Sequence, residues 1–91
     1  MVLSEVEPEP TTALMARGYA FGQSRVICGV HWQSDVDAGR VMGAATVARL
    51  HSEPTFLDQV AAARAEVQAA RVQGAHASGD CSAEAAALAP H

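Results

Sequence analysis

Residues 34–50 read SDVDAGRVMGAATVARL, and this stretch decides the fold class. Ser34, Asp35 and Asp37 favour the first turn of a helix, because their oxygens accept free backbone N–H groups and the carboxylates suit the positive end of the helix dipole. Apolar or small residues then recur on nearly every side of the expected helix. A helix with so little polar surface is typical of a buried one, so we expect a buried helix over 34–50.

Two further long helices are expected, one on each side of this one. Pro8 and Pro10 fit a helix start, and apolar residues at helical spacing follow them, which predicts a first helix near 9–25. Pro54 repeats the start signal after Ser-Glu, and an apolar stripe continues from it until Gly74. The sequence therefore predicts helices both before and after 34–50.

Two shorter segments also carry secondary-structure signals. Residues 26–30 combine β-branched side chains with Gly29, which predicts a turn just before His31. An alanine-rich run over about 82–88 predicts a short final helix. The expected fold class is all-α, with three to four helices.

Composition excludes several classes of function. The chain has 91 residues and a formal net charge of −4, with six arginines that are scattered rather than clustered and no lysine, so nucleic-acid binding is not expected. No apolar run approaches the ~18 residues of a membrane span, and the acidic N-terminus is unlike a signal peptide. Cys28 and Cys81 are either two reduced thiols or one bridge, and spacing alone does not distinguish these states.

Residues 24–35, SRVICGVHWQSD, concentrate the groups that carry chemistry. Arg25 offers a planar, permanently charged fork that can bind two phosphate oxygens at once. His31 and Asp35 stand four apart and would share one helix face, where the carboxylate can hold one ring nitrogen protonated. The other nitrogen is then free to act as a nucleophile.

Each of these residues, and several near them, also has a plain structural explanation. A His and an Asp four apart are common on solvated helix faces, and a single arginine is more often a surface charge. Ser24 fits a helix-end hydroxyl, and Cys28 and Trp32 are more often core residues than reactive ones. His51 and His76 have no partners at metal-ligand spacing, so we predict surface histidines and no metal site.

The pattern Ser-Arg, five residues, His, three residues, Asp at 24–35 resembles the third signature motif of the phosphatidic acid phosphatase type 2 and vanadium haloperoxidase superfamily. The longer stretch ARGYAFGQSRVICGVHWQSDVDAGR at 16–40 looks like class A bacterial non-specific acid phosphatases. The resemblance continues through 48–51 and into the 81–88 tail. It concerns the C-terminal portion of that family only.

The resemblance implies an all-α fold that is the C-terminal part of a larger helical phosphatase core. It also implies hydrolysis of phosphomonoesters without a metal or other cofactor, through a phosphohistidine, with sensitivity to vanadate. By position, His31 would be the nucleophile and Asp35 would orient it. Arg25 would bind the phosphoryl oxygens, with Ser24 in a supporting role.

Further expectations follow from the family. Its members are typically periplasmic, although this chain shows no signal peptide, and an oxidising compartment would permit a disulfide between Cys28 and Cys81. The expected partners are a phosphomonoester or inorganic phosphate, with no nucleic acid and no membrane. A homo-oligomer or a complementing chain is also among the expectations.

The family builds its site from three motifs, and this chain contains the third alone. The first motif needs a lysine, and the second is Pro-Ser-Gly-His, whose histidine protonates the leaving alcohol; neither occurs here. Residues 1–91 are therefore expected to be a partial acid phosphatase domain that is weakly active or inactive alone. The alternatives are a small helical protein whose motif is an inactive relic or a phosphate-binding module, and a helical partner that completes another chain.

Overall fold

The computed structural model describes residues 1–89, and the secondary structure there consists of helices without strands. This confirms the all-α fold class. The helices are α1 (Val2–Val6), α2 (Thr11–Ile27), α3 (Gln33–Leu50), α4 (Pro54–Val72) and α5 (Cys81–Leu88). The four longer ones coincide closely with the predicted segments, whereas α1 has no counterpart among them.

Two glycines explain why α2 and α4 end where they do. Gly29 and Gly74 have φ angles of 75° and 84°, a left-handed conformation that glycine adopts without strain. After α2, the Gly29 N–H donates to the Val26 carbonyl and the next N–H donates to Arg25, and the same pair of bonds closes α4. This is the Schellman arrangement, which stops a helix and turns the chain.

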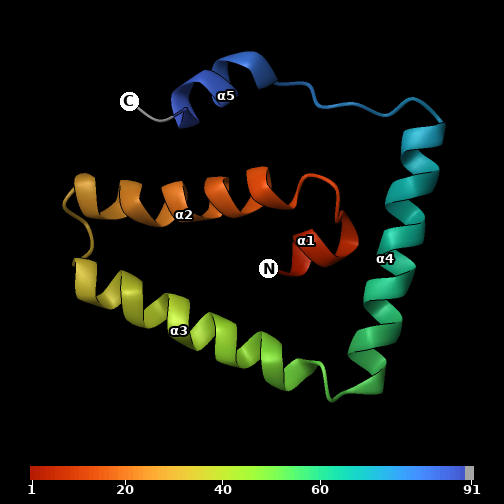
Figure 1. Cartoon of the computed structure of the whole chain (residues 1–91), viewed down its shortest axis with the longest axis horizontal. Helices are drawn as coiled ribbons and strands as arrows, with labels where there is room; N and C mark the ends of the chain where they lie inside the picture. The colour runs from red at the N-terminus through yellow and green to blue at the C-terminus, as the bar shows by residue number, and fades with distance from the viewer. Residues whose placement is uncertain (90–91) are drawn as a thin grey trace.

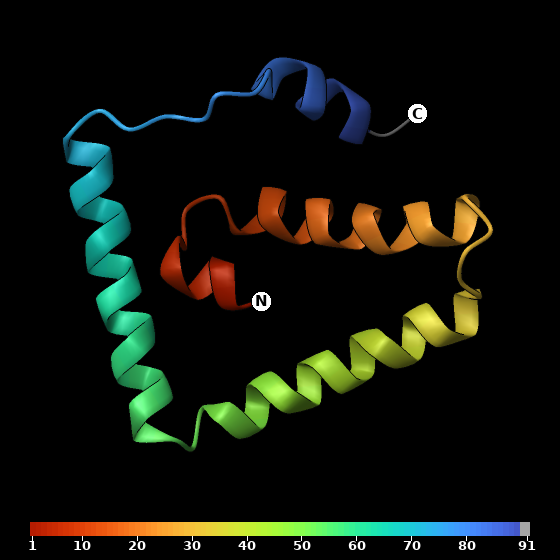
Figure 2. The ribbon, with the colours of Figure 1, turned by 180° about the vertical axis from the view of Figure 1, so that it is seen from behind.

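The helices form an open frame rather than a closed bundle. α2, α3 and α4 make three sides of the frame, and α1 lies inside it in both views (Figure 1, Figure 2). α1 contacts α4 and α2, while α5 returns along α2 and contacts it. An ion pair of 2.5 Å between Arg17 of α2 and Glu84 of α5 connects these two helices.

Little of the chain is buried in this frame. The radius of gyration is 15.6 Å, whereas a compact chain of this length would have about 12 Å. Val6 of α1 is the one buried hydrophobic residue in the described part of the chain. Every helix within residues 1–89 is too short or too polar to span a bilayer.

The prediction of a buried helix over 34–50 is wrong for this chain by itself. Val41 and Met42 of α3 are 68% and 65% exposed, and no residue of that helix is buried. The reason is a shortage of neighbours, because α2 is the main helix that packs against α3. A helix that is apolar on most sides expects more cover than these five helices supply.

Candidate active site

The site lies at the corner where α2 turns into α3. Arg25 is in the last turn of α2, and its backbone carbonyl accepts hydrogen bonds from the N–H groups of Val30 at 3.2 Å and His31 at 3.3 Å. The left-handed Gly29 makes this return possible. The main chain therefore connects the predicted anion-binding arginine directly to the predicted nucleophile.

Asp35 binds His31 as the sequence predicts, but by a different route. His31 precedes α3 instead of lying on it, and Asp35 is the third residue of that helix. Its Oδ2 accepts the N–H of Trp32 at 2.7 Å, while its Oδ1 lies 2.8 Å from Nδ1 of His31. The carboxylate thus caps the start of α3 and reaches back to the ring.

These hydrogen bonds also fix the electrostatics of the pair. The N–H of Trp32, and after it the contact with His31, hold the pKa of the Asp35 carboxyl below its ordinary value. The carboxylate is therefore ionised at mildly acidic pH. A charged acceptor at Nδ1 favours the tautomer with its proton on that nitrogen, which leaves the lone pair on Nε2.

Arg25 and Ser24 differ in how free their side chains are. Arg25 is exposed, and its guanidinium makes no ion pair within residues 1–89. The Ser24 hydroxyl donates to the Phe21 carbonyl at 2.6 Å, one turn back along its own helix. Arg25 is thus ready to take an anion, whereas the hydroxyl of Ser24 is engaged with the backbone.

An open hollow of about 520 Å³ lies beside His31. His31 forms part of its wall, and the other lining residues are mostly apolar or small: Val26, Gly29, Val30, Trp32 and Gln33. Trp32 is 81% exposed. His31 therefore borders an open space that a small molecule can enter.

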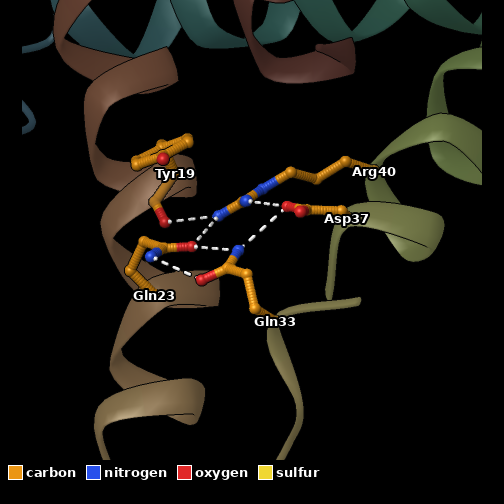
Figure 3. A network of polar contacts seen from close by, with 5 residues as sticks. All are labelled: Tyr19, Gln23, Gln33, Asp37 and Arg40. Carbon is orange, nitrogen blue, oxygen red and sulfur yellow. Dashed lines mark hydrogen bonds and ion pairs between the residues drawn. The ribbon is translucent and has the colours of Figure 1, made fainter. Parts of the chain in front are cut away.

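A polar network near the corner connects α2 to α3, and it was not predicted from the sequence, where Asp37 was expected only to favour the start of a helix. Figure 3 shows Tyr19 and Gln23 of α2 meeting Gln33, Asp37 and Arg40 of α3. The three residues of α3 stand at i, i+4 and i+7, the spacing of one helix face. That polar stripe at 33–40 is the signal by which the network could have been found.

Known proteins match this segment closely. The chain is 54% identical over 66 residues to the non-specific acid phosphatase of Providencia stuartii and 57% identical over 67 residues to that of Salmonella typhimurium. An acid phosphatase of Zymomonas mobilis is 39% identical over 71 residues. By sequence, this chain belongs to the non-specific acid phosphatase family. The matches confirm the predicted family resemblance.

The alignments cover most of this chain but only a small part of each relative. It covers 72%, 74% and 78% of this chain in the three cases, but 27% of each relative. The chain thus spans about a quarter of the length of these acid phosphatases. No family model and no solved structure matches it.

His51 has a role that its sequence context did not indicate. Its Nδ1 contacts the Val47 carbonyl at 2.6 Å and its Nε2 lies 3.0 Å from a carboxylate oxygen of Glu5 in α1. These contacts, that with Val47 first, raise the pKa of His51. His76, by contrast, meets only the neighbouring Ala77 carbonyl within the described residues and is the surface histidine expected.

Cys28 and Cys81 are exposed free thiols in this structure. Cys28 ends α2, whereas Cys81 begins α5, whose Glu84 pairs with Arg17 in the middle of α2. From Arg17 to Cys28 the helix advances by about 16 Å, and a disulfide needs Cα atoms within about 7 Å. A bridge between them stays a prediction, and it would require α5 to move along α2.

Proposed function

We propose that this chain carries the nucleophile and one phosphate-binding arginine of an acid phosphatase that hydrolyses phosphomonoesters. The observation that carries the proposal is the 2.8 Å contact between His31 Nδ1 and Asp35 Oδ1, which holds the ring and leaves the lone pair of Nε2 free to attack phosphorus. The guanidinium of Arg25 supplies the anion-binding charge, and the backbone carbonyl of the same residue accepts a hydrogen bond from the His31 N–H.

The chemistry runs in two displacements. The lone pair of His31 Nε2 attacks phosphorus, a P–N bond forms, and the P–O bond to the leaving group breaks with its electrons on that oxygen. The ring becomes positively charged, and Asp35 stabilises it through the Nδ1 proton. Water then attacks phosphorus and passes a proton to solvent, the P–N electrons return to Nε2, and inorganic phosphate departs. Arg25 binds the equatorial oxygens in both steps.

The leaving group determines which phosphomonoesters the isolated chain can hydrolyse. An alkoxide needs a proton from a general acid, which the family supplies through the Pro-Ser-Gly-His motif that this sequence lacks. A nitrophenolate leaves without such help. The isolated chain is therefore weakly active toward aryl phosphates and inactive toward alkyl phosphates.

The wider context belongs to the same proposal. Residues 1–91 form a partial acid phosphatase domain, and the exposed apolar residues of α3 are where further helices of a phosphatase core would pack. The complete enzyme works in the periplasm, as the family resemblance implies. The second candidate is a phosphate-binding or partner module without turnover, which the same exposed surface favours.

Orthovanadate binding tests the proposed site separately from turnover. Vanadate resembles the transferring phosphoryl group and forms a bond to a histidine nitrogen. Side-chain ¹⁵N resonances of the four histidines would be followed while vanadate is added to the full chain. We expect Nε2 of His31 to shift alone, and the binding to be lost in Arg25→Ala.

Two further variants make the test specific. Arg25→Lys keeps the charge but loses the planar fork, so we expect weaker binding than in the native chain. His76→Ala removes a surface histidine outside the site and should leave binding unchanged. A shift at another histidine, or none at His31, would contradict the proposed function. Vanadate binding at His31 without aryl phosphate turnover would favour the binding module.

A further inference from the structure

We infer that Arg40 is a positioning residue for this site: it fastens α3 to α2 and so holds Arg25 and His31 in one geometry. The inference rests on the proposed function. Arg40 touches neither of those residues, and its side chain crosses from α3 to α2 behind the corner (Figure 3). It would act on the anion site only through the angle between the two helices.

Arg40 holds α2 by three contacts. Its Nη2 donates to the backbone carbonyl of Tyr19 at 3.2 Å and to Oε1 of Gln23 at 2.9 Å. Its guanidinium carbon also lies 4.1 Å from the centroid of the Tyr19 ring, within cation–π range. With 31% of its side chain exposed, Arg40 is the most covered arginine among the ion pairs of the described residues.

Arg40 is itself held by its own helix. Its Nη1 donates to Oδ1 of Asp37 at 2.9 Å, and the same oxygen accepts from Nε2 of Gln33 at 2.9 Å. Gln33 and Gln23 then exchange two amide hydrogen bonds of 3.1 Å each across the helices. The guanidinium is thus fixed on both sides, as a preorganised fork rather than a mobile surface charge.

Gly22 shows how closely α2 accommodates this side chain. A Cβ atom placed on Gly22 would lie 2.9 Å from Nη2 of Arg40 and 3.2 Å from Cγ1 of Val36. Gly18, one turn earlier on α2, has nothing within 4 Å of such an atom. The glycine at 22 therefore leaves the space through which Arg40 reaches the Tyr19 carbonyl.

The position of these bonds explains what they control. Gln23 and Gln33 stand immediately outside the segment 24–32, which contains Arg25, the turn and His31. The two amide hydrogen bonds between them hold the ends of that segment together. Arg40 adds further bonds that restrict the angle between α2 and α3. A shift of about 1 Å in a bound anion's ligands is enough to weaken catalysis or binding severely.

The test measures vanadate affinity and helix orientation together on the full chain. Vanadate dissociation constants come from the His31 Nε2 resonance, and residual dipolar couplings of backbone amides give the angle between α2 and α3. Arg40→Met removes all the contacts, and Arg40→Lys keeps the charge without the fork. Arg49→Met is the matched control, because Arg49 lies on the same helix, is 72% exposed and pairs with Glu53.

We expect Arg40→Met to weaken vanadate binding about tenfold and to change the angle between the helices. Arg40→Lys should lose most of the same affinity, whereas Arg49→Met should change it less than about twofold. Circular dichroism checks that helix content is kept. If Arg40→Met unfolds, Gln23→Ala removes an acceptor from α2 with less disturbance and should produce the same changes, smaller in size.

Native affinity and an unchanged angle in Arg40→Met would overturn the inference. Full affinity in Arg40→Lys would overturn it as well, since a distant positive charge would then be sufficient to attract the anion. If the native chain binds no vanadate at His31, the proposed function fails and the inference with it. The first two results leave the proposed function standing, so the two failures are distinguishable.

Discussion

The corner of α2 and α3 and the arm formed by α4 are held in place by different means. At the corner, all the connecting bonds fall within residues 19–40, from the Arg40 contact with Tyr19 to the Asp35 cap of α3. The arm is held from a distance, because Arg64 donates to the Glu5 carbonyl and Arg71 pairs with Glu7 at 2.5 Å. The corner is locally encoded, whereas the arm depends on the N-terminal segment.

The candidate site lies in the locally bonded corner rather than in the arm. Loop closure over a short segment costs little entropy, so local bonds can hold the corner without a large core. The arm joins groups separated by as many as 59 residues, and the arginines that make these contacts are exposed, so each contact contributes little to stability. The site should therefore keep its geometry when the arm is disturbed.

Gly29→Val should have the largest effect and would break the corner. A β-branched residue at a φ angle of 75° costs roughly 1–2 kcal/mol and displaces His31 from the Arg25 carbonyl. We expect vanadate affinity at His31 to fall tenfold or more, measured by ¹⁵N resonances.

Gly74→Val is its matched control in the arm. Gly74 has a φ angle of 84° and closes α4 with the same Schellman bonds, far along the chain from the site. Its stability loss, from thermal unfolding, should be similar, while vanadate affinity stays within about twofold of native. Equal losses of affinity in both variants would show that the corner has no local independence.

Gly22→Ala and Gly18→Ala test whether the space beside Gly22 matters for the position of Arg40. Alanine in place of a helical glycine gains about 1 kcal/mol where it fits, so Gly18→Ala should stabilise the chain. At Gly22 the new Cβ would crowd Arg40 and Val36, so the gain should vanish and vanadate affinity should fall a few-fold. Thermal unfolding and vanadate titration of both variants check this, and identical behaviour would count against the role of Arg40.

Acidity should have the smallest effect, and it should act through the contact between His51 at the end of α3 and Glu5 of α1 rather than at the corner. Neutral imidazole has one N–H and cannot donate to both Val47 and Glu5, so the folded chain raises the pKa of His51 above its ordinary ~6.5. A raised pKa gives stability that is present below pH ~6.5 and lost as pH rises through the folded value. Hydrogen exchange of α1 and α4 amides should therefore be slower at pH 6 than at pH 8, after correction for intrinsic rates.

Glu5→Gln supplies the control for this pH dependence. The variant removes the charge that pairs with His51 but keeps the length of the side chain. The difference between pH 6 and pH 8 should shrink in Glu5→Gln, while exchange at the α2–α3 corner stays as in the native chain. A pH effect on the arm that persists fully in Glu5→Gln would exclude the His51 pair as its source.

Sequence reasoning could find the corner because its signals are local. Gly29 marks the turn, Asp35 both caps α3 and contacts the ring of His31, and each effect acts over a few residues. The helix expected over 34–50 was likewise correct in extent. Its exposure was not predictable from periodicity, since burial depends on how many neighbours the rest of the fold provides.

The contacts between helices escaped prediction for a related reason. Arg40 reaches Tyr19, and His51 reaches Glu5, only because the chain turns at particular angles between the helices. Local patterns do not contain those angles. The short helix α1 was missed because a five-residue segment gives too little periodicity to recognise.

The central claim is that His31 is a nucleophile that this chain already orients, and p-nitrophenyl phosphate tests it most directly because its leaving group needs no general acid. Hydrolysis at acidic pH would be measured for the native chain, for His31→Ala and with orthovanadate present. We predict slow turnover that is lost in His31→Ala and blocked by vanadate, with none on an alkyl phosphate. Equal rates in the native chain and His31→Ala would contradict the account.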